Sequence, residues 1–213
     1  MLLKNALKIL TACLAVGCCH AAEFTIQDEF NTFSRGRSTV ALEDRSNQEQ
    51  WEIVGPVRDI SCGDGVLKLA GPARTEVRLF SKRSFKFGSL NARIRLDTAG
   101  KSFNSYVGFA RKEPWAAEIA WVQFNDSGLG YLLSGRDKTL PKDIWAVNSG
   151  ELKPGVWYDL RIDWTPTRVE LFIDGKSRGK ITEVPAIPQT PLPLLLAIFS
   201  MEQPYSLSID RIV

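Results

Sequence analysis

Residues 157–175 read WYDLRIDWTPTRVELFIDG, and this stretch decides the fold. Apolar and polar side chains alternate up to Trp164 and again from Val169 to Ile173. Such alternation is typical of strands that bury one face, because successive side chains in a strand point to opposite sides. Thr165-Pro166 between the runs, and Asp174-Gly175 after them, are turn residues. The stretch therefore predicts an antiparallel hairpin.

Short runs of the same kind recur along the whole chain, separated by residues that favour turns. They include Trp51–Val54, Val66–Leu69, Leu90–Leu96, Leu192–Phe199 and Ser206–Val213. The run from Leu192 is almost continuously apolar, as expected for a strand that is buried on both faces. No long stretch has helical periodicity, and we find no repeat or linker. The 213 residues therefore predict one all-β sandwich domain with a sizeable core.

Residues 1–22 are predicted to be an export signal. Two lysines precede a short apolar run, and Ala21 or Ala22 supplies the small residue before a cut. The run is too short to span a bilayer. A buried N-terminal helix is the alternative, and Leu14–Cys18 also resembles a bacterial lipoprotein box that would put a lipid anchor on Cys18. We expect a mature domain over residues 23–213, periplasmic or extracellular, without a transmembrane span.

Loss of this segment would exclude several kinds of chemistry. It would remove His20, the single histidine, and every cysteine except Cys62. The mature chain could then form no internal disulfide, Ser-His-Asp triad, Cys-His pair or histidine-ligated zinc site. Removing Lys4 and Lys8 from 27 basic residues leaves 25 against 24 acidic ones. This near-neutral balance is not that of a nucleic-acid-binding protein.

Residues 115–124 read WAAEIAWVQF and lie near the middle of the chain. Apolar, β-branched and aromatic residues dominate, and the stretch itself contains no glycine or proline. This composition predicts a strand over the whole stretch.

Taken in order, these segments resemble glycoside hydrolase family 16, the lichenases, laminarinases and related β-glucanases. The residues that carry the resemblance are Thr75–Arg78, Phe85–Gly88, Ala92–Leu96, Pro114–Ile119, Trp157–Pro166, Val169–Gly175 and Ser208–Val213. They span nearly the whole mature chain, and the hairpin is the most specific part. The resemblance implies a concanavalin A-like β-sandwich (jelly roll) that binds polysaccharide or oligosaccharide. A monomer is expected.

The family's catalytic strand reads Glu-x-Asp-x-(x)-Glu, with the first Glu as nucleophile and the last as acid/base. The resemblance puts Glu118 at the nucleophile position and Ala120 at the Asp position. The acid/base position falls on Gln123 if the strand carries a β-bulge, and on Val122 if it does not. An amide has no ionisable proton, and retaining glycosidases need two carboxyl groups about 5–5.5 Å apart. The resemblance therefore implies a degenerate site that binds sugar without cleaving it.

Other interpretations stay open. An active retaining glycosidase could combine Glu118 with a second carboxylate from Glu113, Asp126 or Glu76. A structural module of the cell envelope would have no sugar site. Glu118 could also be a surface carboxylate that lines a groove or pairs with a nearby arginine.

A lyase and a metal site are two further possibilities that the resemblance raises. Arg74–Arg78 resembles the R-[ST]-E-[LV]-R strand of an alginate lyase family on the same jelly roll, but that family also needs a Gln-x-His element. A structural calcium near Glu29 and Asp210 would suit family 16. No other cofactor is expected.

Sugar binding needs aromatic faces for stacking and polar side chains for the hydroxyls. The candidates are Trp115, Trp121, Trp145, Tyr106, Tyr131, Asn104, Arg78 and Glu76. Each tryptophan could instead be a core residue. In a regular strand Trp115 and Trp121 point away from the Glu118 side, because both lie three positions from it. Trp115 escapes this rule if Ala116-Ala117 belongs to a loop.

Overall fold

The computed structural model describes residues 51–56, 60–97, 103–125, 130–136, 145–200, 202 and 204–213. The predicted export signal with Cys18, and also Glu29 and Asp126, lie outside these residues. Within the described ranges, no helix has the length and apolar character needed to cross a membrane.

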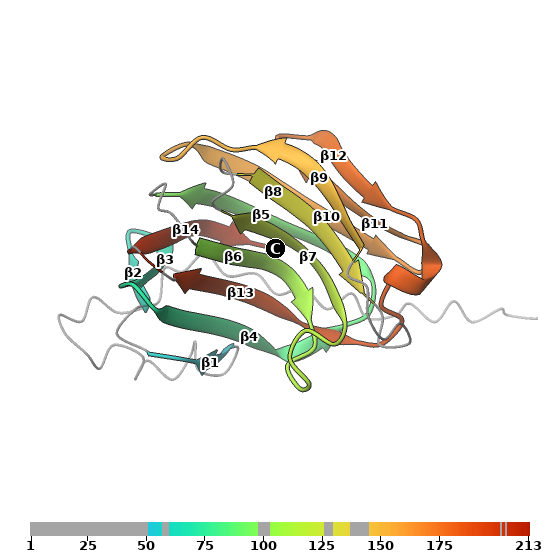
Figure 1. Ribbon diagram of the computed structural model, residues 1–213, viewed down its shortest axis with the longest axis horizontal. Helices are drawn as coiled ribbons and strands as arrows, with labels where there is room; N and C mark the ends of the chain where they lie inside the picture. Colours follow the sequence, from blue (N-terminus) through green and yellow to red (C-terminus); the bar gives the residue numbers. More distant parts are fainter. Residues whose placement is uncertain are drawn as a thin grey trace, which may run out of the picture.

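The described chain forms two sheets of antiparallel strands, with one sheet in front of the other in Figure 1. The front sheet contains, in spatial order, β1 (Trp51–Val54), β4 (Thr75–Phe85), β13 (Leu192–Ser200), β6 (Phe103–Ala110), β7 (Ile119–Asn125), β8 (Gly130–Arg136) and β9 (Trp145–Glu151). The back sheet contains β12 (Lys176–Ile181), β11 (Arg168–Ile173), β10 (Trp157–Thr165), β5 (Gly88–Leu96), β14 (Tyr205–Ile212), β3 (Val66–Gly71) and β2 (Ile60–Gly63). A 3-10 turn, η2 (Val184–Ala186), precedes β13.

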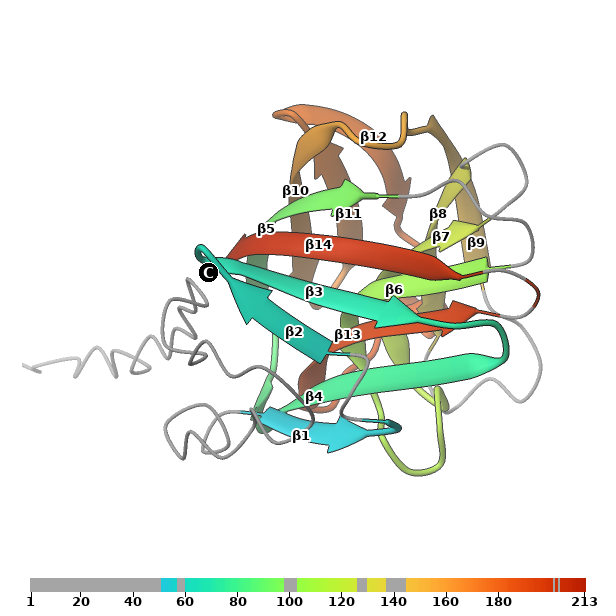
Figure 2. The same cartoon turned by 90° about the vertical axis from the view of Figure 1, so that its left-hand side faces the viewer.

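The two sheets lie face to face as layers (Figure 2) and enclose the main core. The predicted hairpin is confirmed as β10 and β11, with Ile162 opposite Leu171. Both side chains are buried, as the alternating pattern required. Trp164 is also buried, and its indole N–H donates to the Pro188 carbonyl oxygen at 3.1 Å. The predicted all-β jelly-roll sandwich is therefore confirmed.

The apolar run from Leu192 is also confirmed as a strand that is buried on both faces. In β13, Leu196 and Ile198 belong to the main core, whereas Leu195 and Ala197 belong to a second, smaller cluster on the outer face of the front sheet. Water is excluded from both sides of the strand, so something must cover its outer side. Part of that cover comes from the connection between β6 and β7, whose Ala116 packs against the smaller cluster.

The central strand begins later than the sequence predicted. Residues 115–118 are not part of it, and β7 starts at Ile119. Ala116 has a φ of 54°, a turn conformation that a strand does not allow. The Ala116 and Ala117 N–H groups donate within the connection, to the Arg111 and Pro114 carbonyl oxygens, both at 3.1 Å. The prediction of a strand over 115–124 is wrong for its first four residues.

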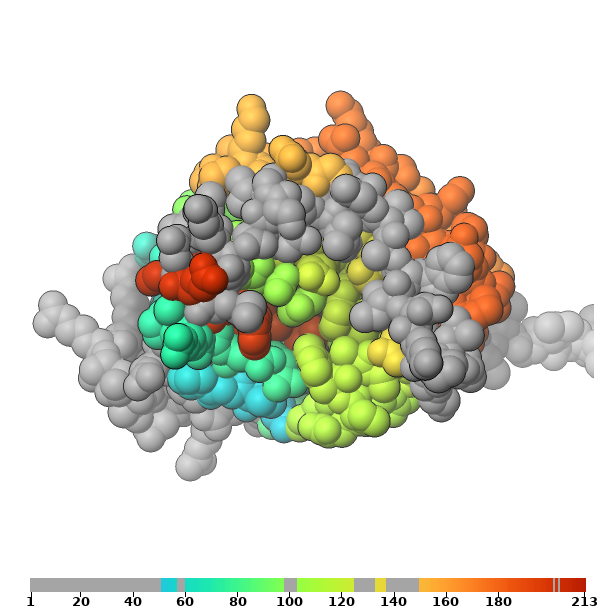
Figure 3. All heavy atoms as spheres, viewed as in Figure 1, coloured from blue at the N-terminus to red at the C-terminus, as the bar shows by residue number. Residues whose placement is uncertain are grey.

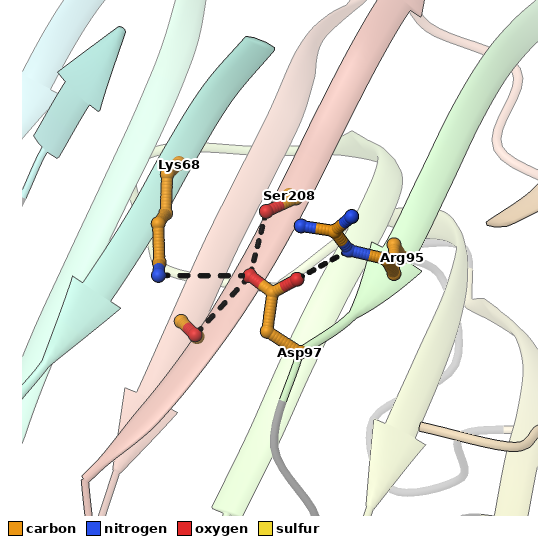
Figure 4. A network of polar contacts seen from close by, with 5 residues as sticks. Lys68, Arg95, Asp97 and Ser208 are labelled. Atoms are coloured by element: carbon orange, nitrogen blue, oxygen red, sulfur yellow. Dashed lines mark hydrogen bonds and ion pairs between the residues drawn. The ribbon is translucent and has the colours of Figure 1, made fainter. Parts of the chain in front are cut away.

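A polar network ties together three strands of the back sheet around Asp97 (Figure 4). The Asp97 carboxylate accepts hydrogen bonds from Ser208 Oγ at 2.6 Å and from Ser206 Oγ at 3.2 Å, both on β14. Arg95 Nε of β5 donates to it at 2.5 Å, and Lys68 Nζ of β3 lies 4.0 Å away. The network faces away from the front sheet and has a structural role.

Gly108 is a position where the fold requires glycine. It lies opposite Trp121 in the register of β6 and β7, with a φ of 149°. A Cβ atom there would come within 2.5 Å of the Trp121 Cα. We expect Gly108→Ala to lower the free energy of unfolding by about 1–3 kcal/mol, because neither backbone can give way. Urea unfolding of Gly108→Ala would measure the loss.

Gly63→Ala is the matched control for this prediction. No heavy atom lies within 4 Å of a Cβ built at Gly63. Its stability should therefore stay within about 0.5 kcal/mol of the parent protein. Equal stability of Gly108→Ala and Gly63→Ala would contradict the close approach of β6 and β7.

Candidate functional site

The outer face of the front sheet collects most of the candidate residues. The main core takes alternate side chains of β4, β13, β6 and β7, so the other alternates point outward. Cross-strand register arranges the outward residues in three rows. The first row contains Phe80, Leu195, Gly108 and Trp121, and the second contains Arg78, Ala197, Tyr106 and Gln123. The third row contains Glu76, Phe199 and Asn104. Residues that are far apart in the sequence thus meet on one surface.

Residues 111–118, the connection between β6 and β7, fold over the first row; we call this segment the loop. Its tip residue Trp115 contacts Phe80 at a ring-centroid distance of 6.0 Å and Trp121 at 5.8 Å. Phe80 and Trp121 are almost fully buried, whereas Trp115 remains 36% exposed. In Figure 3 the face is hollowed over β6, β7 and β13, and the yellow-green loop forms the lower rim. The loop therefore covers one part of the face and leaves the rest open.

Glu118, the last residue of the loop, is fully buried. Arg111 Nε and Nη2, at the other end of the loop, both pair with its Oε2 atom. Thr190 Oγ1 donates to Oε1 at 2.8 Å and accepts a hydrogen bond from Arg111 Nη2 at 3.2 Å. The carboxylate is thus enclosed by partners on both oxygens. The structure places it away from the open surface that a nucleophile position would require.

The faces of β7 also differ from the sequence-based assignment. The register of β7 with β6 and β8 is continuous, without a bulge. Ala120 and Val122 lie in the main core, so neither lines the outer face. Among the residues of β7 whose side chains the structure describes, Ile119, Trp121 and Gln123 face outward instead. Because the loop ends only at Glu118, the outward positions of β7 start one residue later than predicted. Of the positions that the resemblance matched to the family's three catalytic acids, only Gln123 faces outward.

The open part of the outer face is polar and aromatic. Gln123 Nε2 donates to Asn104 Oδ1 at 2.8 Å. Arg78 Nε lies 2.9 Å from Glu76 Oε1, and the same guanidinium sits 4.4 Å above the centre of the Trp115 ring. This arrangement is an ion pair combined with a cation–π contact. The structure thus places Arg78 beside Glu76 and Trp115, and Asn104 beside Gln123, on one face of the sheet. A role of these residues in sugar binding stays a prediction.

Tyr106 lies in the middle row, with its ring centroid 4.6 Å from that of Trp121. Burial raises the pKa of its phenol above the usual 10.0, and the negative charge of Glu76 raises it further. The phenol therefore remains a neutral hydrogen-bonding group at any physiological pH.

The remaining predicted residues lie elsewhere. Trp145 opens β9 opposite Gly135, but its side chain and that of Tyr131 are outside the described residues. Asp210 pairs with Arg93 at 3.1 Å on the back sheet. No three His, Cys, Asp or Glu side chains gather into a possible metal site in the described part of the chain. Glu113 is an exposed loop residue.

Sequence reasoning missed Arg111 and Thr190. Arg111 had a local signal, since the two residues that flank a hairpin connection lie opposite one another, and the Arg111 N–H donates to the Glu118 carbonyl oxygen at 2.9 Å. Thr190 had none, because it is 72 residues away from Glu118 in the sequence.

Comparison with known proteins shows the fold. No model of a known family matches the chain, and no curated protein sequence matches it. Among solved structures, the β-glucanase of Bacillus licheniformis has 13% identity and a TM-score of 0.67, over 88% of this chain and 95% of that one. LamAcat from Zobellia galactanivorans has 14% identity and a TM-score of 0.64, over 88% and 95%. The Crh5 transglycosylase, solved with NAG, has 15% identity and a TM-score of 0.64, over 88% and 82%.

At these identities the likeness is one of fold, and function must be argued from the site. The chain has the β-sandwich of these glucanases, as the resemblance to glycoside hydrolase family 16 implied.

Titration of Tyr106 tests the described environment. The folded protein holds the Tyr106 phenol proton more tightly than the unfolded chain does. The contribution of Tyr106 to the free energy of unfolding is therefore fully present below pH 10 and is lost as the pH rises above 10. Phenolate absorbance of the parent protein minus that of Tyr106→Phe should titrate with a midpoint above 10. Glu76→Gln should lower that midpoint but keep it above 10, because burial is the larger cause. A midpoint at or below 10 in the parent protein would contradict the buried position.

Proposed function

We propose that this protein binds a β-linked glycan on the outer face of its front sheet without hydrolysing it, and that it does so as an exported protein. The observation that carries the proposal is the outward side of β7. Its described positions are Ile119, Trp121 and Gln123, and none is a carboxylate.

Glycoside hydrolysis in the usual mechanisms needs two carboxyl groups on either side of the scissile bond. They lie about 5–5.5 Å apart in retaining enzymes and about 6.5–9.5 Å apart in inverting ones. Among the described outward positions of β4, β13, β6 and β7, Glu76 is the single carboxylate, and it is paired with Arg78. Glu118 is fully buried against Arg111, and a buried carboxylate cannot reach an anomeric carbon. These positions favour binding over catalysis.

The open rows offer what sugar binding requires. The exposed edge of Trp115 and the ring of Tyr106 provide apolar surface for a pyranose ring. Gln123, Asn104 and Arg78 carry amide and guanidinium groups that pair with hydroxyls. The solved structures with this fold include β-glucanases and a transglycosylase complexed with NAG. A glycan is therefore the ligand class that suits both fold and surface.

The proposal is tested by incubating the purified protein with laminarin, lichenan, agarose and carrageenan. We expect binding to at least one of them and no release of reducing ends. Trp115→Ala should weaken that binding roughly 5–30-fold, as expected for the loss of one aromatic stacking contact worth about 1–2 kcal/mol.

Trp157→Ala is the matched control. Trp157 is also a partly buried tryptophan beneath arginines, with Arg95 at 4.7 Å and Arg93 at 5.5 Å from its ring, but it belongs to the back sheet. Its removal should leave glycan affinity unchanged. Reducing-end release that disappears in Glu118→Gln would instead establish the glycosidase alternative. Absence of binding to every glycan would favour a structural module of the cell envelope.

Export has its own test. When the full chain is expressed in a bacterial host, the mass of the processed protein should lack residues up to Ala21 or Ala22. A mass that includes a diacylglyceryl group on Cys18, and that changes in Cys18→Ala, would show lipid anchoring instead of simple cleavage. An intact Met1 in the mature protein would contradict export.

A further inference from the structure

Glu118 is fully buried although the proposed function gives it no reaction to perform. Its side-chain contacts add to the backbone pairing of β6 with β7 and extend to a third segment of the chain. Arg111 follows β6, Glu118 precedes β7, and Thr190 precedes β13. The carboxylate thus adds a side-chain contact at the base of the loop, where the Arg111 N–H also donates to the Glu118 carbonyl oxygen, and it ties the loop to the segment before β13.

The segment closed in this way carries Trp115 at its tip. Trp115 packs edge-on against Phe80, at an interplanar angle of 85°, and stands beneath the Arg78 guanidinium. Ala116 packs against the small outer cluster. Whatever holds the base of the loop therefore decides where this aromatic ring stands on the outer face.

We infer that Glu118 is a positioning residue: with Arg111 and Thr190 it forms a clasp that holds Trp115 against Arg78 and Trp121 as one wall of the glycan-binding face. The glycan part of this inference rests on the proposed function. The position of the wall does not, and it is measurable without any sugar.

The chemistry of burial explains why the clasp is specific. A carboxylate removed from water needs charged or hydrogen-bonding partners on each oxygen, and Arg111 and Thr190 supply them. The other polar tie of the loop, between Lys112 and Glu52, joins two partly exposed side chains. Exposed ion pairs contribute little because water screens them. The contact of the fully buried Glu118 carboxylate is therefore the stronger of these two side-chain restraints on the loop.

The wall also determines which part of the outer face a glycan can reach. With the loop in place, Phe80, Leu195 and Trp121 of the first row are almost fully buried. The second and third rows, which contain Arg78, Tyr106 and Glu76, remain partly exposed. A glycan chain therefore runs beside Trp115 instead of over Trp121, because Glu118 keeps the loop in place over Trp121.

The test uses the full mature protein and near-ultraviolet circular dichroism. The Trp115 and Trp121 rings lie 5.8 Å apart and should couple, so Trp115→Ala defines the spectrum of a protein without the wall. We expect Glu118→Gln to lose most of that coupled signal and to weaken binding of laminarin roughly 5–30-fold, as Trp115→Ala does. Glu118→Asp, which keeps the charge, should recover part of the signal.

Asp97→Asn is the matched control, since Asp97 also pairs with an arginine and two hydroxyls but lies on the back sheet. It should lower the melting temperature without changing the tryptophan signal or laminarin binding. Thr190→Val serves if Glu118→Gln does not fold; it removes the two hydrogen bonds of the Thr190 hydroxyl and should reduce the signal in part.

A full coupled signal in a folded Glu118→Gln, or in Thr190→Val, would overturn the clasp. Equal loss of signal in Asp97→Asn would also overturn it, because the effect would then be one of general stability. The clasp would be supported if Glu118→Gln lost the coupled signal and Asp97→Asn kept it. If the parent protein also bound no glycan, the proposed function would be refuted while the clasp would stand.

Discussion

The main core buries Ala120, Val122 and Phe124 of β7, and this burial sets which side chains β7 turns outward. Alternation in a strand has a period of two residues, so a slip of one residue would exchange the two faces completely. Continuous pairing with β6 on one side and β8 on the other prevents such a slip. The described outward side chains of β7, which are apolar, aromatic and amide instead of acidic, follow from this single register.

The same register leaves Glu118 at the junction of loop and strand, where it is out of reach of solvent. The Glu118 side chain is fully buried, whereas 31% of the Arg111 side chain is exposed. Loss of Arg111 would leave a buried carboxylate without its charged partner, which is unfavourable. Arg111 and Glu118 are therefore kept together by the cost of separating them. The contact is a feature of loop architecture, and it accounts for an acidic residue in a stretch that otherwise has the composition of a core strand.

The two outer faces of the sandwich differ in use of their polar groups. On the back sheet, Asp97 engages its serine and arginine neighbours in a network that crosses β3, β5 and β14. On the front sheet, Arg78 pairs with Glu76 and lies over Trp115, and Gln123 donates to Asn104, on the face that is hollowed over β6, β7 and β13 (Figure 3). The chain shares its fold with a β-glucanase at 13% sequence identity, and a shared fold does not by itself determine which side chains its outer faces carry.

The sequence by itself determined the strands with clear alternation, the hairpin of β10 and β11, the doubly buried β13 and hence the jelly-roll sandwich. These features can be predicted because a strand that packs against a core needs apolar side chains on its buried face, and this produces a recognisable local sequence pattern. It did not determine where β7 begins or which side of it faces outward. Ile119-Ala120-Trp121-Val122 is apolar throughout, so alternation there carries no information about the inner face. Only the tertiary structure decided this, through the positive φ of Ala116, the pairing with β6, and a hydrogen bond to Glu118 from Thr190, 72 residues away.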